Sequence, residues 1–238
     1  LDPTIINGGV LNSIGSSAKL GKSDWSIIES DESDGSFLQI PFNYSIITNI
    51  DNEHLDYYKN IYNLKNKFIE FLDKTPSFGK AFVCSDDNNI KNILPKLKNK
   101  NYYTYGLNKK SNFCISNIIQ KKNFSKFDIK IKIPGKQRVL KNLTIPLIGV
   151  HNIKNAASAL SVAFSIGVSD KIIKKGLKNF KGVQRRFNYL FEKNQIPFFD
   201  DYAHHPTEIE SVLDGVKKVY NDEEIFCIFQ PHRISRVR

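Results

Sequence analysis

The chain has 238 residues, of which 40% are hydrophobic, and its 35 Lys and Arg against 24 Asp and Glu give a formal net charge of +11. A chain of this length and composition can bury a substantial core, which excludes a wholly disordered protein and makes a disulfide framework unnecessary. No apolar run approaches the roughly 18 to 20 residues of a membrane-spanning helix, so we expect no membrane partner.

The first hundred residues predict an α/β domain with a mostly parallel sheet. Short apolar runs typical of strands alternate along the chain with segments whose apolar residues have helical spacing, which favours this arrangement. In such sheets ligands bind at the carboxyl ends of the strands. The loops after residues 29 and 50 are expected at that edge. The predicted strands are 25–29, 44–50, 81–84 and 102–105, and the predicted helices cover 61–72 and about 88–97.

The character of the sequence changes after about residue 113. Residues 129–133 alternate strictly between Ile and Lys, and 139–148 are again β-like, which predicts a small antiparallel sheet attached to the main domain. A helix is expected from 149 and another over about 171–180. Gly182 then marks a hinge. Strands at 187–191, 196–200 and 225–229 with a helix from Pro206 predict the opening of another α/β domain.

The positive charge does not by itself predict a nucleic-acid partner. Lysines are scattered along the chain, whereas a nucleic-acid binder usually concentrates its basic residues on one face. Arginine is different, because five of the six Arg lie in the last quarter, and the guanidinium fork suits phosphate or carboxylate. A basic nucleic-acid or anion-binding module stays as the opposing hypothesis. Three Cys without paired spacing indicate reduced thiols and a cytoplasmic protein.

Three segments carry chemistry-bearing residues. The acidic turn 29–34 offers four carboxylates at a strand end, and His54 follows the next strand, so a Mg²⁺ site and a solvated acidic loop are both open interpretations of these two segments. Residues 200–208 hold three acids, a Tyr and two His, a density that a helix cap alone does not explain. Residues 15–23 look like a phosphate-binding loop, but five residues separate the glycines where the loop requires four.

Seven segments in order resemble the Mur ligase family over the whole chain. They are Asn7-Gly8-Gly9, 29–37, 48–56, His151-Asn152-x-x-Asn155-Ala156, Arg185-Arg186-Phe187, 200–208 and 229–236. The resemblance implies that residues 1–182 are a central ATP-binding domain without its phosphate-binding loop. Residues 183–238 would be the first part of a C-terminal Rossmann-like domain that binds the amino acid and ATP. With no Met in the chain, we expect an internal fragment that is inactive alone.

The resemblance also implies an activity and a set of roles. The forms of the 31–34 and 229–233 motifs favour a ligase of peptidoglycan synthesis that uses ATP and Mg²⁺ to join L-alanine to the carboxylate of UDP-N-acetylmuramate through an acyl phosphate. A related ligase that recycles muropeptides is the alternative. Glu29 and His54 would bind Mg²⁺. Nucleotide contacts would come from Asn152 and Asn155 (adenine), Arg186 (phosphate) and Asp201 (ribose), and the amino-acid and acyl-phosphate side from Tyr202, His204, His232, Arg233 and Arg236.

Within that set, His204, Arg233 and Arg236 are the residues expected to be catalytic. Whether His204 or His205 faces the site, whether any Lys is carbamoylated, and the oligomeric state are left open by the sequence.

Overall fold

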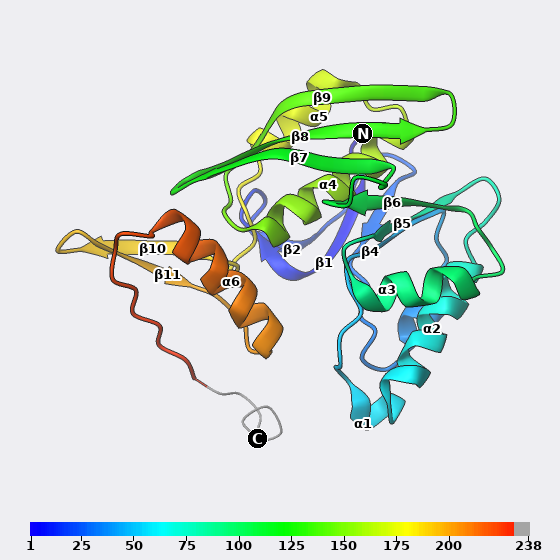
Figure 1. The fold of residues 1–238 in the computed structure, drawn as a ribbon, viewed down its shortest axis with the longest axis horizontal. Coiled ribbons are helices and arrows are strands. Elements are labelled where there is room, and N and C mark those ends of the chain that lie inside the picture. The colour runs from blue at the N-terminus through cyan, green and yellow to red at the C-terminus, as the bar shows by residue number, and fades with distance from the viewer. Residues whose placement is uncertain (231–238) are drawn as a thin grey trace.

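The centre of the molecule is a six-stranded sheet in the order β4-β5-β6-β7-β8-β9 (Figure 1). The computed structural model describes residues 1–230. The first three pairings are parallel and the last two antiparallel. The strands are β4 (Tyr44–Ile47), β5 (Lys80–Cys84), β6 (Tyr102–Gly106), β7 (Phe113–Lys121), β8 (Phe124–Ile133) and β9 (Lys136–Ile145). The α/β class is confirmed, and the antiparallel strands prove to be a continuation of the main sheet.

Helices cover this sheet and close its core. On β8, Phe127, Ile129 and Ile131 are at most 1% exposed, as expected for side chains that alternate between a buried and a solvated face. They share one apolar cluster with Ile153 and Leu160 of α4. The helices are α1 (Leu55–Tyr58), α2 (Ile61–Asp73), α3 (Asn88–Ile93), α4 (Val150–Ser165) and α5 (Asp170–Lys178), with 3₁₀ turns η1 (Ser36–Gln39) and η2 (Leu94–Lys96).

The helix expected over 88–97 is divided into α3 and η2. Asp87 caps α3 by accepting a hydrogen bond from the Ile90 N–H at 2.7 Å. Pro95 lacks the N–H that an α-helix needs at that point, so the chain continues as a 3₁₀ turn.

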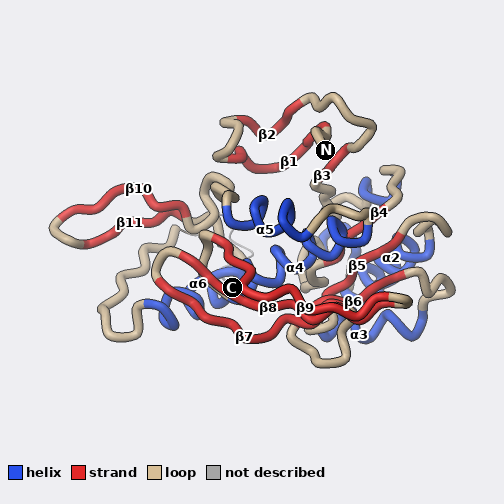
Figure 2. Tube along the Cα trace, turned by 90° about the horizontal axis from the view of Figure 1, so that it is seen from above, coloured by secondary structure: helices blue, strands red, loops and turns tan. Residues whose placement is uncertain are grey.

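The N-terminal residues form a separate sheet that the sequence analysis largely missed. It has the order β2-β1-β3, from β1 (Thr4–Leu11), β2 (Ser16–Lys19) and β3 (Ser26–Ile28). Figure 2 shows α4 and α5 lying between this sheet and the main sheet. The strand expected at 25–29 therefore lies in a different sheet from β4 and does not pair with it. Residues 15–23 are a hairpin turn and a strand, and they do not open a helix as a phosphate-binding loop does, which confirms their rejection.

The C-terminal part consists of a hairpin and a helix, β10 (Asn188–Lys193), β11 (Ile196–Asp200) and α6 (Pro206–Val219). The chain enters it past Gly182, whose carbonyl accepts a hydrogen bond from the Asn12 N–H at 3.1 Å. The prediction of a strand at 225–229 is wrong, because these residues form no strand. No neighbouring strand pairs with it there, and Phe226 and Ile228 are 77% and 96% exposed. Within residues 1–230, no helix combines the length and apolarity needed to cross a membrane.

Candidate functional site

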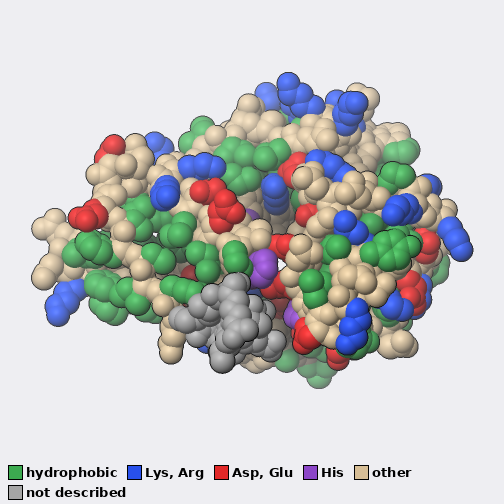
Figure 3. All heavy atoms as spheres, turned by 60° about the horizontal axis from the view of Figure 1, so that its bottom comes forward, with side chains coloured by type: hydrophobic (Ala, Val, Ile, Leu, Met, Phe, Trp, Pro, Cys, Tyr) green, Lys and Arg blue, Asp and Glu red, His purple; other side chains and the backbone are tan. Residues whose placement is uncertain are grey.

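Several of the residues expected in the functional site gather at the carboxyl edge of the parallel strands. β4 and β5 are paired in parallel, so the loops that follow them emerge side by side. The Asn89 side chain joins the two loops by donating to the Ile50 carbonyl at 2.6 Å. The first turns of α4 reach the same edge, where Lys154 Nζ lies 3.2 Å from Asp86 Oδ2. The space-filling view shows His side chains next to acidic ones in a hollow between two parts of the molecule (Figure 3).

His54 is the centre of a group that could hold a cation. Its Nε2 atom lies 3.6 Å from Glu32 Oε1 and 3.9 Å from Glu53 Oε2. One ligand atom from each of these three residues falls within 4.8 Å of the others, and within residues 1–230 no other His, Cys, Asp or Glu group meets this criterion. His54 has φ 56°, a conformation that costs energy in most residues and that often marks a functional site.

Glu32 reaches this group from the acidic turn. Burial raises the pKa of the Glu32 carboxyl above its usual value, because the loss of solvent destabilises the charged form. The Tyr58 hydroxyl donates a hydrogen bond to the Glu32 carbonyl and fixes the turn. Burial also raises the pKa of Tyr58 to about 12, so this hydroxyl remains a donor at neutral pH. Two carboxylates and one imidazole fit a divalent cation, and the Glu32 carboxylate is partly buried, with 36% of its side chain exposed.

Glu29, the other residue expected to bind metal, is held differently. It follows β3, and its Oε2 accepts a hydrogen bond from the Gly8 N–H at 2.6 Å. It is not part of the group around His54. The acidic turn therefore meets the His54 loop, as expected for a shared site, but through Glu32. The role of Glu29 as a metal ligand stays a prediction.

The residues expected to bind the nucleotide lie on two elements. Asn152 and Asn155 are three positions apart and so share one face of α4, where the Asn152 amide donates to the Ile148 carbonyl at 2.7 Å. Both oxygens of Asp201 accept main-chain hydrogen bonds at 2.7 Å, from Phe187 and Ala203. The carboxylate keeps lone pairs for further donors, such as a ribose hydroxyl.

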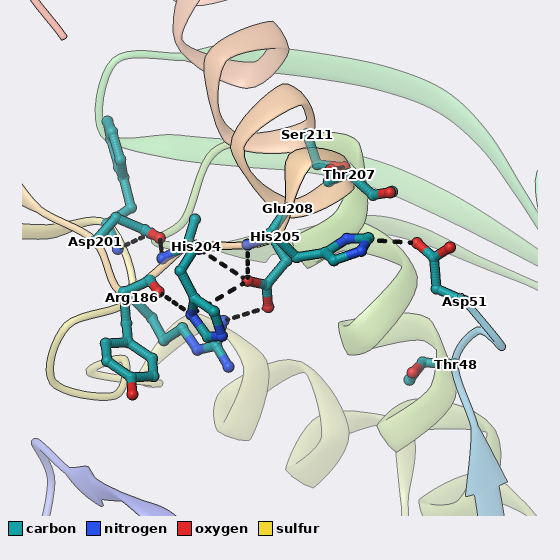
Figure 4. A network of polar contacts seen from close by, with 12 residues as sticks. Thr48, Asp51, Arg186, Asp201, His204, His205, Thr207, Glu208 and Ser211 are labelled. Atoms are coloured by element: carbon teal, nitrogen blue, oxygen red, sulfur yellow. Dashed lines mark hydrogen bonds and ion pairs between the residues drawn. The ribbon is translucent and has the colours of Figure 1, made fainter. Parts of the chain in front are cut away.

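Tyr202 and His204, two of the residues expected on the amino-acid side, lie in a short segment before α6 (Figure 4). The His204 ring lies against Tyr202, and its Nδ1 is 2.7 Å from the Tyr202 carbonyl oxygen. Glu208 faces both His204 and Arg186, at 3.8 and 3.5 Å. His232, Arg233 and Arg236 lie outside the described residues, so their predicted roles stay predictions.

The structure also shows a histidine that the assigned site omitted. His205 points toward the loop after β4, with its ring nitrogens 3.7 Å from Asp51 and 3.9 Å from Glu53 (Figure 4). His204 instead contacts its own segment. The signal in the sequence was the His pair itself, but only the fold shows which ring reaches the acidic loop.

His151 is a second residue that sequence reasoning left without a role. It lies in the first turn of α4 near Asp201 and Arg186, and burial lowers its pKa below the usual range, so the ring is held neutral. Gly149 precedes it with φ +90°, and a Cβ there would meet the His151 ring at 2.5 Å. The glycine thus allows the buried imidazole to fold back over the helix start.

Two family models match the chain, and together their matches extend over most of it. The Mur ligase middle domain matches residues 17–163, and the glutamate ligase domain of Mur ligases matches residues 185–237. The first match alone covers more than half of the chain. The chain therefore belongs to the Mur ligase family.

Individual relatives narrow the similarity further. The chain is 60% identical over its whole length to a UDP-N-acetylmuramate–L-alanine ligase from Pelagibacter ubique, of which it covers 52%. The crystal structure of a UDP-N-acetylmuramate–alanine ligase from Thermotoga maritima matches with a TM-score of 0.79 and 28% identity, over 98% of this chain and 51% of that one. A murein peptide ligase from Psychrobacter arcticus matches with a TM-score of 0.66 and 25% identity, over 91% and 49%. The chain spans about half the length of these relatives.

Proposed function

We propose that this chain is part of an ATP-dependent ligase that joins L-alanine to the carboxylate of UDP-N-acetylmuramate in peptidoglycan synthesis. The observation that carries the proposal is the 60% identity to a ligase of that name along the entire chain. The geometry supports it, because the His54 group, the start of α4 and the segment before α6 converge at one edge of the sheet. We further propose a cytoplasmic enzyme with a domain boundary near residue 182, which the two family matches support.

The proposed reaction brings several anions together, so the site must supply positive charge and donors. ATP would provide the phosphoryl group that activates the carboxylate, and Mg²⁺ would provide charge close to the phosphates. His54 with Glu32 and Glu53 would hold a cation, and Glu29 would be a further ligand. Asn152 and Asn155 would bind the adenine through their amide groups.

The remaining residues would act on phosphate, ribose and the amino acid. Arg186 would contact phosphate and Asp201 the ribose hydroxyls. Tyr202 and His204 would line the amino-acid side, and His204 would be catalytic there. The same proposal gives His232, Arg233 and Arg236 the amino-acid and acyl-phosphate contacts, with the two arginines catalytic. Arginine suits this task because its planar fork binds phosphate and carboxylate bidentately.

The test is alanine-dependent phosphate release by the full-length polypeptide that contains this chain. We expect release with UDP-N-acetylmuramate and Mg-ATP, and a loss of at least 100-fold in His54→Ala, as when an electrostatic contact to a transition state is removed. Glu70→Gln, on the exposed face of α2, is the matched control and should retain activity. Full activity of His54→Ala would contradict the metal assignment.

A muropeptide-recycling ligase is the second candidate, because a murein peptide ligase shares the fold at 25% identity. The two differ in the amine that they accept. Phosphate release that requires a tripeptide and ignores free alanine would favour the recycling activity. Salt-dependent binding to random DNA without any effect of Mg-ATP would favour the nucleic-acid module instead.

A further inference from the structure

The Glu53 carboxylate lies between two imidazoles that come from opposite parts of the chain. Its Oε2 atom is 3.9 Å from Nε2 of His54, at the start of α1. Its Oε1 atom is 3.9 Å from Nε2 of His205, immediately before α6. One side chain thus connects the candidate cation group with the segment that carries the expected amino-acid site.

The same loop faces the other side of the His205 ring. Nδ1 of His205 lies 3.7 Å from Asp51 Oδ2, so each ring nitrogen has a carboxylate oxygen opposite it. The His205 side chain is only 17% exposed, and Figure 4 shows the ring directed from the start of α6 to Asp51. These separations are close approaches that exceed the length of a hydrogen bond.

The two Glu53 oxygens have separate tasks in this geometry. A cation bound by Glu32, His54 and Glu53 would use Oε2, the oxygen on the His54 side. Oε1 would remain directed at His205. Carboxylates that bind metals are commonly oriented by an outer partner, and removing that partner typically weakens metal binding about 10- to 100-fold.

We infer that His205 is a positioning residue that orients Glu53 for the cation and thereby couples cation binding to the docking of residues 201–208. This inference rests on the proposed cation site and goes beyond it. Tyr202 and His204 belong to the same short segment, so its docking sets their distance from the cation. Coupling between two binding events is reciprocal, so the cation must also strengthen the docking of the segment.

The first experiment measures Mn²⁺ binding to the full-length polypeptide without nucleotide, by electron paramagnetic resonance. We expect His205→Asn to weaken binding about 10-fold, and Glu53→Gln to weaken it at least as much. Glu70→Gln is the matched control for Glu53→Gln, because the Glu70 carboxylate pairs with Lys67 and Lys74 on α2, and its Mn²⁺ affinity should equal that of the unmodified protein. Thermal unfolding of each variant verifies that it is folded.

The outcomes separate this inference from the proposed function. Mn²⁺ binding that is lost in His54→Ala but unchanged in His205→Asn would overturn the positioning role and leave the cation site intact. Mn²⁺ binding that is insensitive to His54→Ala would overturn both.

A second experiment tests the docking directly. Nitroxide labels at Asn92 on α3 and Lys218 on α6, both exposed, would report the distance between these two helices. The labels would be introduced in a Cys227→Ser background, because Cys84 and Cys114 are buried. We expect Mg²⁺ to narrow the distance distribution in the unmodified sequence and not in His205→Asn. Equal narrowing in both proteins would contradict the coupling.

Discussion

Replacing Asp86 by Ala should loosen the sheet edge on which the site is built. The Asp86 carboxylate accepts hydrogen bonds from the N–H groups of Leu107, at 2.9 and 3.0 Å, and of Asn108, at 3.1 Å. It also pairs with Lys154 on α4. A single side chain, 15% exposed, therefore joins the ends of β5 and β6 to the helix that carries Asn152 and Asn155.

The expected loss follows from these contacts. Hydrogen bonds to a charged acceptor contribute about 1.5 to 3 kcal/mol each, and the lower figure applies because the two N–H groups can reach water. The pair with Lys154 is partly exposed and adds less than about 1 kcal/mol. We therefore expect Asp86→Ala to lower the free energy of unfolding by about 3 kcal/mol, or roughly 6 to 12 °C in Tm for a chain of this size.

Thermal unfolding followed by circular dichroism measures this shift. Asp86→Asn keeps one acceptor oxygen and should lose about half as much. Glu70→Gln is the control, because its exposed pairs with Lys67 and Lys74 contribute at most about 1 kcal/mol. If Asp86→Ala melted within 2 °C of the unmodified protein, the Asp86 contacts would not hold the sheet edge together.

Three further predictions concern the elements around the site. Because burial lowers the pKa of His151 below its usual 6.5, the folded chain binds fewer protons than the unfolded chain, so the stabilising contribution should be full above pH 6.5 and fall as the pH drops toward the folded pKa. Urea unfolding at pH 7.5 and 5.5 gives the free energy of unfolding at each pH, and His151→Gln should reduce the difference between the two values. An unchanged difference would contradict this. Gly176→Ala, with open space around it, should stabilise α5 by about 0.5 to 1 kcal/mol. Gly215→Ala should give no gain, because its Cβ would lie 3.0 Å from the Cα of Gly149, the residue that precedes α4. Equal shifts in Tm for the two variants would refute the close packing of α6 on the start of α4. Tyr58→Phe should cost about 1 kcal/mol and weaken Mn²⁺ binding, since the Glu32 turn loses its hydroxyl donor, and unchanged Mn²⁺ affinity would show that the turn holds its position without Tyr58.

The main sheet could be predicted because its strands have clear local patterns. The alternation in β8 and the apolar spacing of α2 and α4 identify elements whose buried faces are set by the sequence itself. β1 was missed because Gly8 and Gly9 interrupt it, and its pattern has little alternation. Gly9 is needed because a Cβ there would meet the Val183 side chain at 2.6 Å, and this residue is so distant in the chain that local patterns do not encode the contact.

The parts of the candidate site were predicted, and so was the meeting of the acidic turn with the His54 loop, but the individual contacts were not. The acidic turn, His54 and the 200–208 segment were found because they concentrate unusual residue types. The contact of Glu32 with His54, and of His205 with Glu53, depends on how two sheets and α6 pack, which spacing does not show. The segment 225–229 illustrates the opposite error, because β propensity predicts a strand only where a neighbouring strand can pair with it.

The central claim, that this chain belongs to an alanine-adding ligase with its cation site at His54, is tested most directly by product formation. The full-length polypeptide would be incubated with UDP-N-acetylmuramate, isotopically labelled L-alanine, ATP and Mg²⁺, and the product mass determined. We predict a product that carries the labelled alanine, that requires ATP, and that His54→Ala does not form. Failure of the unmodified protein to incorporate alanine, or equal incorporation by His54→Ala, would contradict the claim.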